Sequence, residues 1–454
     1  MAELEVKKSY FVALDTYELS GGTADDMSAA TLAALTTFKT LRPGSGTAED
    51  RTAFLLEPSG LPDLSFDYEE ITRDVIRNSY LPAAPLRGVI NTTGSMTVEL
   101  HGGSELSTLI KKPDYHPLLH SGFGQFNVGA ITAGVITGDL SATVVGTTIG
   151  GTAMNTSGFS VGDIIVLEGA TATATNILIG QVLTSHATTG TVLTMYVGAG
   201  VLASDTYASI SSVGYSMPSS SSGIPNFGIA YYRANVVREI YAKCATTSIE
   251  FPYSAGEIVL PVFNFNVGDG GIAERVYYTA PSTYDTLYGG GGTDSLTSTE
   301  ADPLFAKAVT WKFEIYNAGT GQAWSDLTKT VDSFSLTINN EASTIRDITA
   351  TEGIKSYGMQ GRTVDLTLSA YYDDDTFNTH NITNLFLENA NNRMRISAIT
   401  GTDKGNRCFL FSPSLQFKTT VSEDAGLFKY DVTGTAEKET AYGFGENALV
   451  CVFY

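Results

Sequence analysis

Apolar and polar residues alternate along many short stretches of this chain, which is the period-two pattern of half-buried β-strands. The clearest examples are LSFDYEE at 64–70, GSMTVELHG at 94–102, SFSLTIN at 333–339 and RTVDLTLSAYY at 362–372. Turns rich in Gly, Ser and Thr separate such stretches, and helical patterns are few. The sequence therefore predicts a mainly β protein, of β-sandwich or half-barrel type.

The alternation gives each strand one face toward a core and one face away from it. The predicted buried face consists of Met96, Val98, Leu100, Val364, Leu366 and Leu368. The opposite face carries Thr97, Glu99, Asp365 and Thr367.

The pattern occurs twice, although identity between the copies is low. The first matched block pairs Phe66, Met96, Val98 and Leu100 with Phe334, Val364, Leu366 and Leu368, at an offset of 268 residues. The second pairs Ile258, Leu260 and Val262 after Gly256 with Phe428, Tyr430 and Val432 after Gly426, at an offset of 170. We expect two tandem copies, with roughly a hundred extra residues inside the first.

A helix is expected beside each copy. In 104–112, Ser104 is a candidate N-cap, an i, i+3, i+4 apolar stripe follows, and Pro113 ends the segment. The second copy repeats this spacing within 378–391. Its stripe consists of Ile382, Leu385 and Phe386.

Turn-rich segments suggest the domain boundaries. Residues 123–225 contain GFSVGDIIVLEGA and other short strand patterns, so they predict a small inserted β-domain. Residues 1–60 form an N-terminal arm, with a strand at Tyr10–Leu14 and a weak helical pattern over 27–41; it is either a surface segment or a strap to a neighbouring subunit. The expected division is 1–60 arm, 61–122 and 226–267 first domain, 123–225 insertion, 268–303 linker, and 304–454 second domain.

Composition narrows the class of protein. The 454 residues are 43% hydrophobic and carry a formal net charge of −21, which argues against binding a phosphate backbone through a basic surface. Cys244, Cys408 and Cys451 are too dispersed for a disulfide framework or a metal knuckle, so a reducing cell is the expected place of synthesis. The start, MAELEVKKSYF, lacks the apolar region of a signal peptide, and no apolar run has the length of a membrane span. We expect a soluble chain.

Three segments contain residues found in ligand sites, but the sequence around each one favours a structural role. Gly289–Gly292 precede Thr293 and Asp294 without the Lys of a phosphate loop, which indicates a linker. His116 and His120 have the i, i+4 spacing of a zinc pair, but Pro113 and Pro117 are expected to break that helix and no third ligand is near. The adjacent carboxylates of Asp373, Asp374 and Asp375 lack the alternating ligands of a calcium loop.

Catalytic motifs are also missing from the sequence. It contains no GxSxG, no HExxH and only five histidines to activate its many hydroxyl groups. We therefore expect no catalytic residues, no cofactor and no enzymatic activity.

The order of these segments resembles the tail tube (major tail) proteins of tailed bacteriophages. The segments that carry the resemblance are LSFDYEEITRDVIRNS, GVINTTGSMTVELHGGSELSTLIKK, SFSLTINNEAS, GRTVDLTLSAYYDDD and SPSLQFKTTVSEDAGLFKYDVTGTAEK, with GFSVGDIIVLEG in the insertion. They span roughly residues 60–450. The resemblance implies sandwich or half-barrel domains with a flanking helix, which join edge to edge into rings that stack into a tube.

Several expectations follow from that resemblance. A duplicated chain would reach a sixfold shape as a homotrimer, and the tube would occupy the virion tail after synthesis in the host cytoplasm. Its partners would be further copies of itself, the terminator, the tape measure and the baseplate, with no membrane. Viral DNA would pass without specific binding along a lumen lined by Thr97, Glu99, Asp365 and Thr367. The insertion would decorate the outside, and the arm or the 268–303 loop would bridge successive rings.

Two alternatives remain open. A baseplate hub or terminator of the same fold would form a single ring without polymerising. A secreted β-rich adhesin or glycan-binding module is a different class, against which stand the missing signal peptide and the presence of only Trp311 and Trp324 for sugar stacking.

Overall fold

The chain is mainly β in the computed structural model, which describes its residues in segments. These are 10–15, 53–56, 58–71, 86–103, 105–106, 109–110, 112–129, 136–138, 147–148, 161–169, 177–184, 191–197, 205–210, 212–217, 225–233, 237–268, 274–277, 302–307, 309–317, 323–326, 330–349, 353–371, 393–403, 405–424, 426–438 and 447–454. Across these residues, antiparallel pairings join 18 strands into one sheet system, six into a second and two into a third.

Besides β7 (Gln125–Gly129) and β14 (Ser212–Ser216), which are described below, the first half of the chain contributes eight strands to the large sheet system. They are β1 (Tyr10–Asp15), β2 (Ala53–Leu56), β3 (Asp63–Ile71), β4 (Leu86–Thr97), β15 (Phe227–Arg233), β16 (Val237–Ser254), β17 (Val262–Val267) and β18 (Glu274–Tyr277). Seven of them lie across the sheet in the order β2-β1-β15-β16-β17-β4-β3, each paired with its neighbour.

The second half contributes another eight strands to this sheet system. They are β19 (Thr310–Asn317), β20 (Ala323–Asp326), β21 (Val331–Arg346), β22 (Ile354–Tyr371), β23 (Arg393–Thr400), β24 (Cys408–Asp424), β25 (Leu427–Ala436) and β26 (Val450–Phe453). Seven of them lie in the order β20-β19-β23-β24-β25-β22-β21. Both the order along the chain and the order across the sheet therefore match those of the first half, strand by strand.

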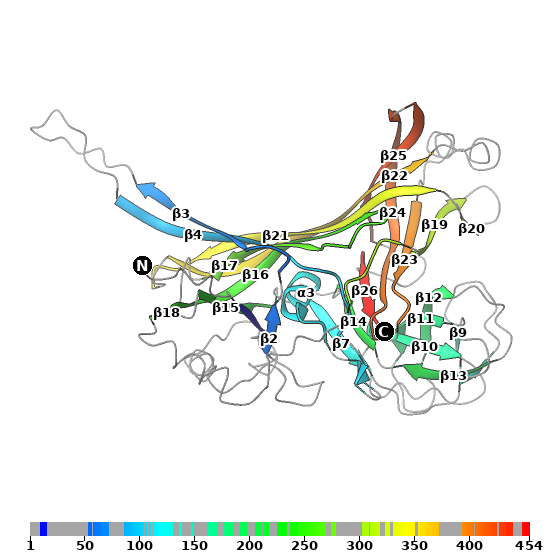
Figure 1. Cartoon of the computed structure of the whole chain (residues 1–454), viewed down its shortest axis with the longest axis horizontal. Coiled ribbons are helices and arrows are strands. Elements are labelled where there is room, and N and C mark those ends of the chain that lie inside the picture. The colour runs from blue at the N-terminus through cyan, green and yellow to red at the C-terminus, as the bar shows by residue number, and fades with distance from the viewer. Residues whose placement is uncertain are drawn as a thin grey trace, which may run out of the picture.

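The two halves meet through one ladder. The last seven residues of β16 pair antiparallel with β21, from Ser248 opposite Asn339 to Ser254 opposite Ser333. Figure 1 shows the result as a long curved sheet, with β3 and β4 at one end and β22 and β25 at the other.

A hydrophobic core covers one face of this sheet. Leu336 and Ile338 of β21 are fully buried, as are Leu118, Leu119 and Phe123 of α3 (His116–Phe123), which lies beneath the middle of the sheet (Figure 1). The burial of alternate residues in β21 shows why the sequence of this strand alternates.

The helix predicted at 104–112 is wrong. Residues Glu105–Leu106 and Leu109–Ile110 instead form β5 and β6, which pair as a small hairpin. The apolar stripe there covers little more than one turn, too short to stabilise a helix without tertiary packing. The second predicted helix, with Ile382, Leu385 and Phe386, lies outside the described residues.

The prediction that prolines prevent a helix at His116 and His120 is also wrong. Pro117 lies in the first turn of α3, where a missing N–H costs nothing and the fixed φ suits the helix. Gly124 ends the helix in the left-handed region at φ 92°, and its N–H donates to the carbonyl of His120 at 2.8 Å.

The range predicted as an insertion, 123–225, contains a sheet of its own. Its six-stranded sheet consists of β8 (Ile136–Gly138), β9 (Thr147–Thr148), β10 (Ile164–Gly169), β11 (Ile177–Thr184), β12 (Thr191–Val197) and β13 (Asp205–Ile210). The flanking strands β7 (Gln125–Gly129) and β14 (Ser212–Ser216) pair with each other, and β14 also pairs with β26. The expected range of 123–225 therefore includes two strands of the large sheet system and part of α3.

The N-terminal segment also contributes to that system, because β1 pairs with β15 and β2 pairs with β1. Strands of the large sheet system thus lie inside the range 1–60 that was expected to be an arm. The helix expected over 27–41 lies outside the described residues, as does most of the expected linker at 268–303, in which β18 pairs with β16.

Candidate functional site

The face of the large sheet opposite the core carries mostly polar side chains. One continuous row crosses seven strands, because each residue is the register partner of the next. The row consists of Thr97, Val262, Glu250, Thr337, Asp365, Thr435 and Gln416. A neighbouring row consists of Pro252, Ser335, Thr367, Thr433 and Lys418. We call this surface the polar face.

Hydrogen bonds between strands hold the side chains of the polar face. The Asp365 carboxylate accepts from Asn339 Nδ2 at 3.0 Å and from Thr435 Oγ1 at 2.9 Å. Ser335 Oγ donates to Glu250 Oε1 at 3.0 Å across the ladder that joins the two halves. Because these carboxylates accept bonds from neighbouring hydroxyl and amide groups, the polar face has an ordered, anionic character.

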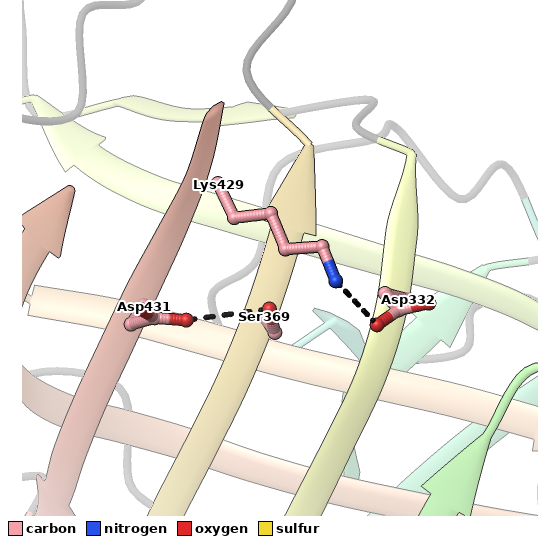
Figure 2. A network of polar contacts seen from close by, with 4 residues as sticks. All are labelled: Asp332, Ser369, Lys429 and Asp431. Atoms are coloured by element: carbon pink, nitrogen blue, oxygen red, sulfur yellow. Dashed lines mark hydrogen bonds and ion pairs between the residues drawn. The ribbon is translucent and has the colours of Figure 1, made fainter. Parts of the chain in front are cut away.

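A lysine beside this face forms an ion pair with an acidic residue. Figure 2 shows Lys429 of β25 reaching over β22 to Asp332 of β21, with Nζ 3.0 Å from the carboxylate oxygen. The same ammonium lies 5.0 Å from the ring centroid of Tyr371. In Figure 2, Ser369 Oγ donates to Asp431 Oδ1 at 3.3 Å nearby. The charge of Lys429 is therefore locally neutralised, whereas Lys418 of the second row is an exposed cation on the polar face.

The site residues proposed from the sequence separate onto the two sides of the sheet. Met96, Val98, Leu100, Val364, Leu366 and Leu368 are buried. Thr97, Asp365 and Thr367 lie on the polar face, and Glu99 is half-buried just beyond the end of β4. Thr97 and Asp365 come from different halves of the chain and share the row that crosses seven strands.

Most residues of the polar face were not among the site residues proposed from the sequence, although their alternation with apolar residues could have identified them. Thr337 and Ser335 alternate with buried residues of β21, and Thr433 and Thr435 do so in β25. The alternation alone would have selected them. A small open hollow of about 260 Å³ also lies here, between Ser335, Thr367 and Asp431.

The histidine pair packs inside the molecule. His116 and His120 stack with ring centroids 5.7 Å apart, and Phe126 packs edge-on against both rings. His116 Nδ1 lies 2.7 Å from the Tyr215 hydroxyl. Among the residues that the structure describes, no three His, Cys, Asp or Glu side chains cluster as metal ligands. The geometry assigns this pair a packing role between α3, β7 and β14.

At two sheet edges, the described ladders run along one side of a strand only. β3 pairs with β4 on one side, and the segment 417–424 of β24 pairs with β25 on one side. Phe66 and Tyr68 of β3 are each 48% exposed, and Val421 of β24 is 52% exposed. Unpaired strand edges of this kind are sites of strand addition.

Comparison with known proteins leaves the fold as the main guide to function. No protein-family model matches the chain, and no curated protein sequence matches it. In the described part of the chain, no helix is long and apolar enough to cross a membrane.

Proposed function

We propose that this chain is a structural subunit of a tube, of the kind formed by bacteriophage tail tube (major tail) proteins. The observation that carries the proposal is the seven-strand arrangement that occurs twice and is joined edge to edge by β16 and β21. A chain that already links two equivalent sheets side by side needs the same junction only between copies to extend the sheet further.

In this proposal the chain consists of two tandem tube-wall domains and an inserted β-domain. Three chains form a homotrimeric, pseudo-sixfold ring, and stacked rings form the tube of the virion tail. Terminator, tape measure and baseplate proteins contact its ends and its interior. The insertion, which forms its own sheet at one end of the view in Figure 1, decorates the outer wall.

The polar face supports the assignment of a lumen. DNA carries about one negative charge per 1.7 Å of its length, so a wall that DNA must pass should present few free cations. Most side chains of the polar face are hydroxyl, amide or carboxylate groups, with Lys418 as a cation in its second row, and Lys429 beside it is paired with Asp332. We therefore place Thr97, Glu99, Asp365 and Thr367 on the inside of the tube.

Negative-stain electron microscopy of the purified full-length chain tests this function. Tubes with a regular axial repeat and a hollow centre are expected, with class averages of single rings showing three copies of the insertion. Single rings that never stack would instead favour a hub or terminator of the same fold. A monomer under all assembly conditions would overturn the proposal.

The adhesin alternative has less support. Trp311, one of the two tryptophans, packs edge-on against Phe313 and stacks on Phe334 with centroids 5.7 Å apart. A ring engaged in this way is not an open platform for a sugar. Binding of the monomer on a glycan array would favour that function instead.

A further inference from the structure

Two of the three cysteines meet across adjacent strands. Cys408 begins β24 and Cys451 lies in β26, and their sulfur atoms are 3.8 Å apart although 43 residues separate them along the chain. In the ladder between these strands, Cys408 is opposite Phe453 and Leu410 is opposite Cys451. The two thiols are therefore diagonal neighbours on one face of the sheet, which their wide spacing in the sequence conceals.

The distance between these sulfur atoms is close to that of a disulfide. An S–S bond is about 2.05 Å long, so the two sulfur atoms need to approach each other by about 1.8 Å. Rotation about the Cα–Cβ bond of each cysteine moves its sulfur atom, and β26 is only four residues long, so a small shift of this strand can complete the approach. The pair is thus placed for a covalent bond between β24 and β26.

The surroundings of the pair favour a neutral link. Cys408 and Cys451 are both fully buried. Burial, and then the neighbouring thiol of Cys408, raise the pKa of the Cys451 thiol well above its ordinary value. The buried Tyr115 hydroxyl on the same side of the molecule donates to the carbonyl of His101 at 2.7 Å. A disulfide replaces two weakly donating S–H groups by an uncharged group without a donor, so it suits a site from which water is excluded.

We propose that Cys408 and Cys451 form a reversible disulfide when the chain meets an oxidising small-molecule disulfide. The thiolate of one cysteine attacks a sulfur atom of that molecule, which gives a mixed disulfide and releases one small thiol. The second cysteine then attacks the protein sulfur of the mixed disulfide, which closes the bond between the two cysteines and releases the other small thiol. The two cysteines together lose two electrons and two protons, and the small-molecule disulfide takes them up as it becomes two thiols.

The bond would fasten the strand that joins the second half of the chain to the base of the insertion. β26 pairs with β24 on one side and with β14 on the other, and β14 pairs with β7. A covalent link between β24 and β26 closes a loop of 43 residues and opposes local opening of β26. The backbone amides of β26 should therefore exchange with solvent about tenfold more slowly in the oxidised chain. This inference stands whether or not the chain forms a tube.

Burial also determines how fast the bond forms. Because both thiols lie inside the molecule, an oxidant reaches them only when β26 opens or before the chain has folded. Oxidation of the folded chain should therefore be slow, and it should accelerate at urea concentrations below the unfolding transition. Once formed, the bond should resist reduction for the same reason.

Treatment of the wild-type, full-length chain with oxidised glutathione tests the pairing. The chain is treated both in the folded state and during refolding from denaturant, and its intact mass and peptide map are then measured under denaturing conditions. The expected product has lost two hydrogen atoms, contains the linked peptides of Cys408 and Cys451, and retains one titratable thiol at Cys244. Glutathione adducts without this link, or equal amounts of the three possible cysteine pairs, would overturn the proposal.

Two variants serve as matched controls. Cys244→Ala keeps the pair, so its oxidised form should contain no titratable thiol. Cys451→Ala removes one partner, and an internal link in this variant would contradict the selection of the pair by the fold. Hydrogen exchange followed by mass spectrometry measures the effect on β26, which should slow on oxidation of the wild type and not of Cys451→Ala. Equal exchange of β26 in the oxidised and reduced wild type would show that the bond does not fasten this strand.

Discussion

Asn340 connects four elements through a single buried amide. Its Nδ2 donates to the carbonyls of Gly122 and Thr246 at 3.0 Å, and its Oδ1 accepts from Arg362 Nε at 2.7 Å. Arg362 Nη1 in turn donates to the carbonyl of Phe123 at 2.9 Å. Burial lowers the pKa of Arg362 to about 10, so the guanidinium remains charged near neutral pH and favours the carbonyls at the end of α3.

Asn340→Ala should therefore destabilise the chain by about 2–4 kcal/mol, because it leaves buried donors and acceptors without their partner. Asn339→Ala is the matched control, since its side chain lies on the half-buried polar face and donates one bond to Asp365. That change should cost no more than about 1 kcal/mol. Urea unfolding followed by circular dichroism measures both, and equal losses would contradict the role of Asn340.

Because several tyrosines are buried, we expect the folded chain to lose stability at alkaline pH. Burial raises the pKa of Tyr115 and Tyr253 well above its ordinary value and that of Tyr357 to about 12. A raised folded-state pKa stabilises the fold fully below about pH 10, and that contribution is lost as the pH rises toward the folded-state value. The melting temperature should fall steadily above pH 10. Tyr357→Phe should reduce that fall, whereas an unchanged pH profile in this variant would contradict the assignment.

At the scale of elements, two phenylalanines that the sequence repeat matches lie in different surroundings. Phe334 is buried and stacks on Tyr253, whereas Phe66 lies on the open edge of β3. Phe334→Ala should destabilise the isolated chain by about 3–4 kcal/mol, and Phe66→Ala by less than about 1 kcal/mol. Chemical unfolding of the monomer measures both, and similar losses would contradict the difference in burial between the two side chains.

Phe66→Ala should act instead on assembly. Phe66 is 48% exposed on β3. If subunits of the proposed ring join through β3, this variant loses apolar contact area, and tubes should form about tenfold less readily at equal protein concentration. Light scattering during assembly measures this effect. Normal assembly of Phe66→Ala would exclude β3 as a joining strand.

The strands could be predicted from the sequence where one face is buried and the other is not. Met96 and Leu366 lie in strands of this kind, and their alternation identified both faces. α3 escaped prediction because all eight of its residues are buried, so it has no polar side to reveal a helical period. The pairing of β16 with β21 could not be predicted from either segment, because register between distant strands depends on how the whole sheet assembles.

At the scale of the whole molecule, the insertion is attached through a narrow base. Gly129 of β7 is opposite Ser212 of β14, so the chain leaves and re-enters the large sheet system at adjacent positions. Contacts across this base include the bond from Asn127 Nδ2 to the carbonyl of Ile164 at 2.8 Å.

Replacing residues 130–211 by a short Gly-Ser turn should therefore preserve the large sheet system. The melting temperature should fall by only a few degrees, since the change removes the core contacts of Ile164 and Val166. If the insertion decorates the wall, tubes of this variant should have the same axial repeat and a smaller outer diameter. Cryo-electron microscopy measures both dimensions, and a smaller lumen with an unchanged exterior would place the insertion inside.

Because one chain contains two equivalent sheets, it also restricts how many sheets a closed ring of such chains can contain. A subunit with a single sheet can close into a ring of five, six or seven whenever the bend between neighbours drifts by a few degrees. Because β16 and β21 fuse the sheets in pairs, rings built from this chain can contain only even numbers of them. The nearest wrong closures of the proposed ring then differ from its six sheets by two sheets instead of one, so a larger error in curvature is needed to reach them.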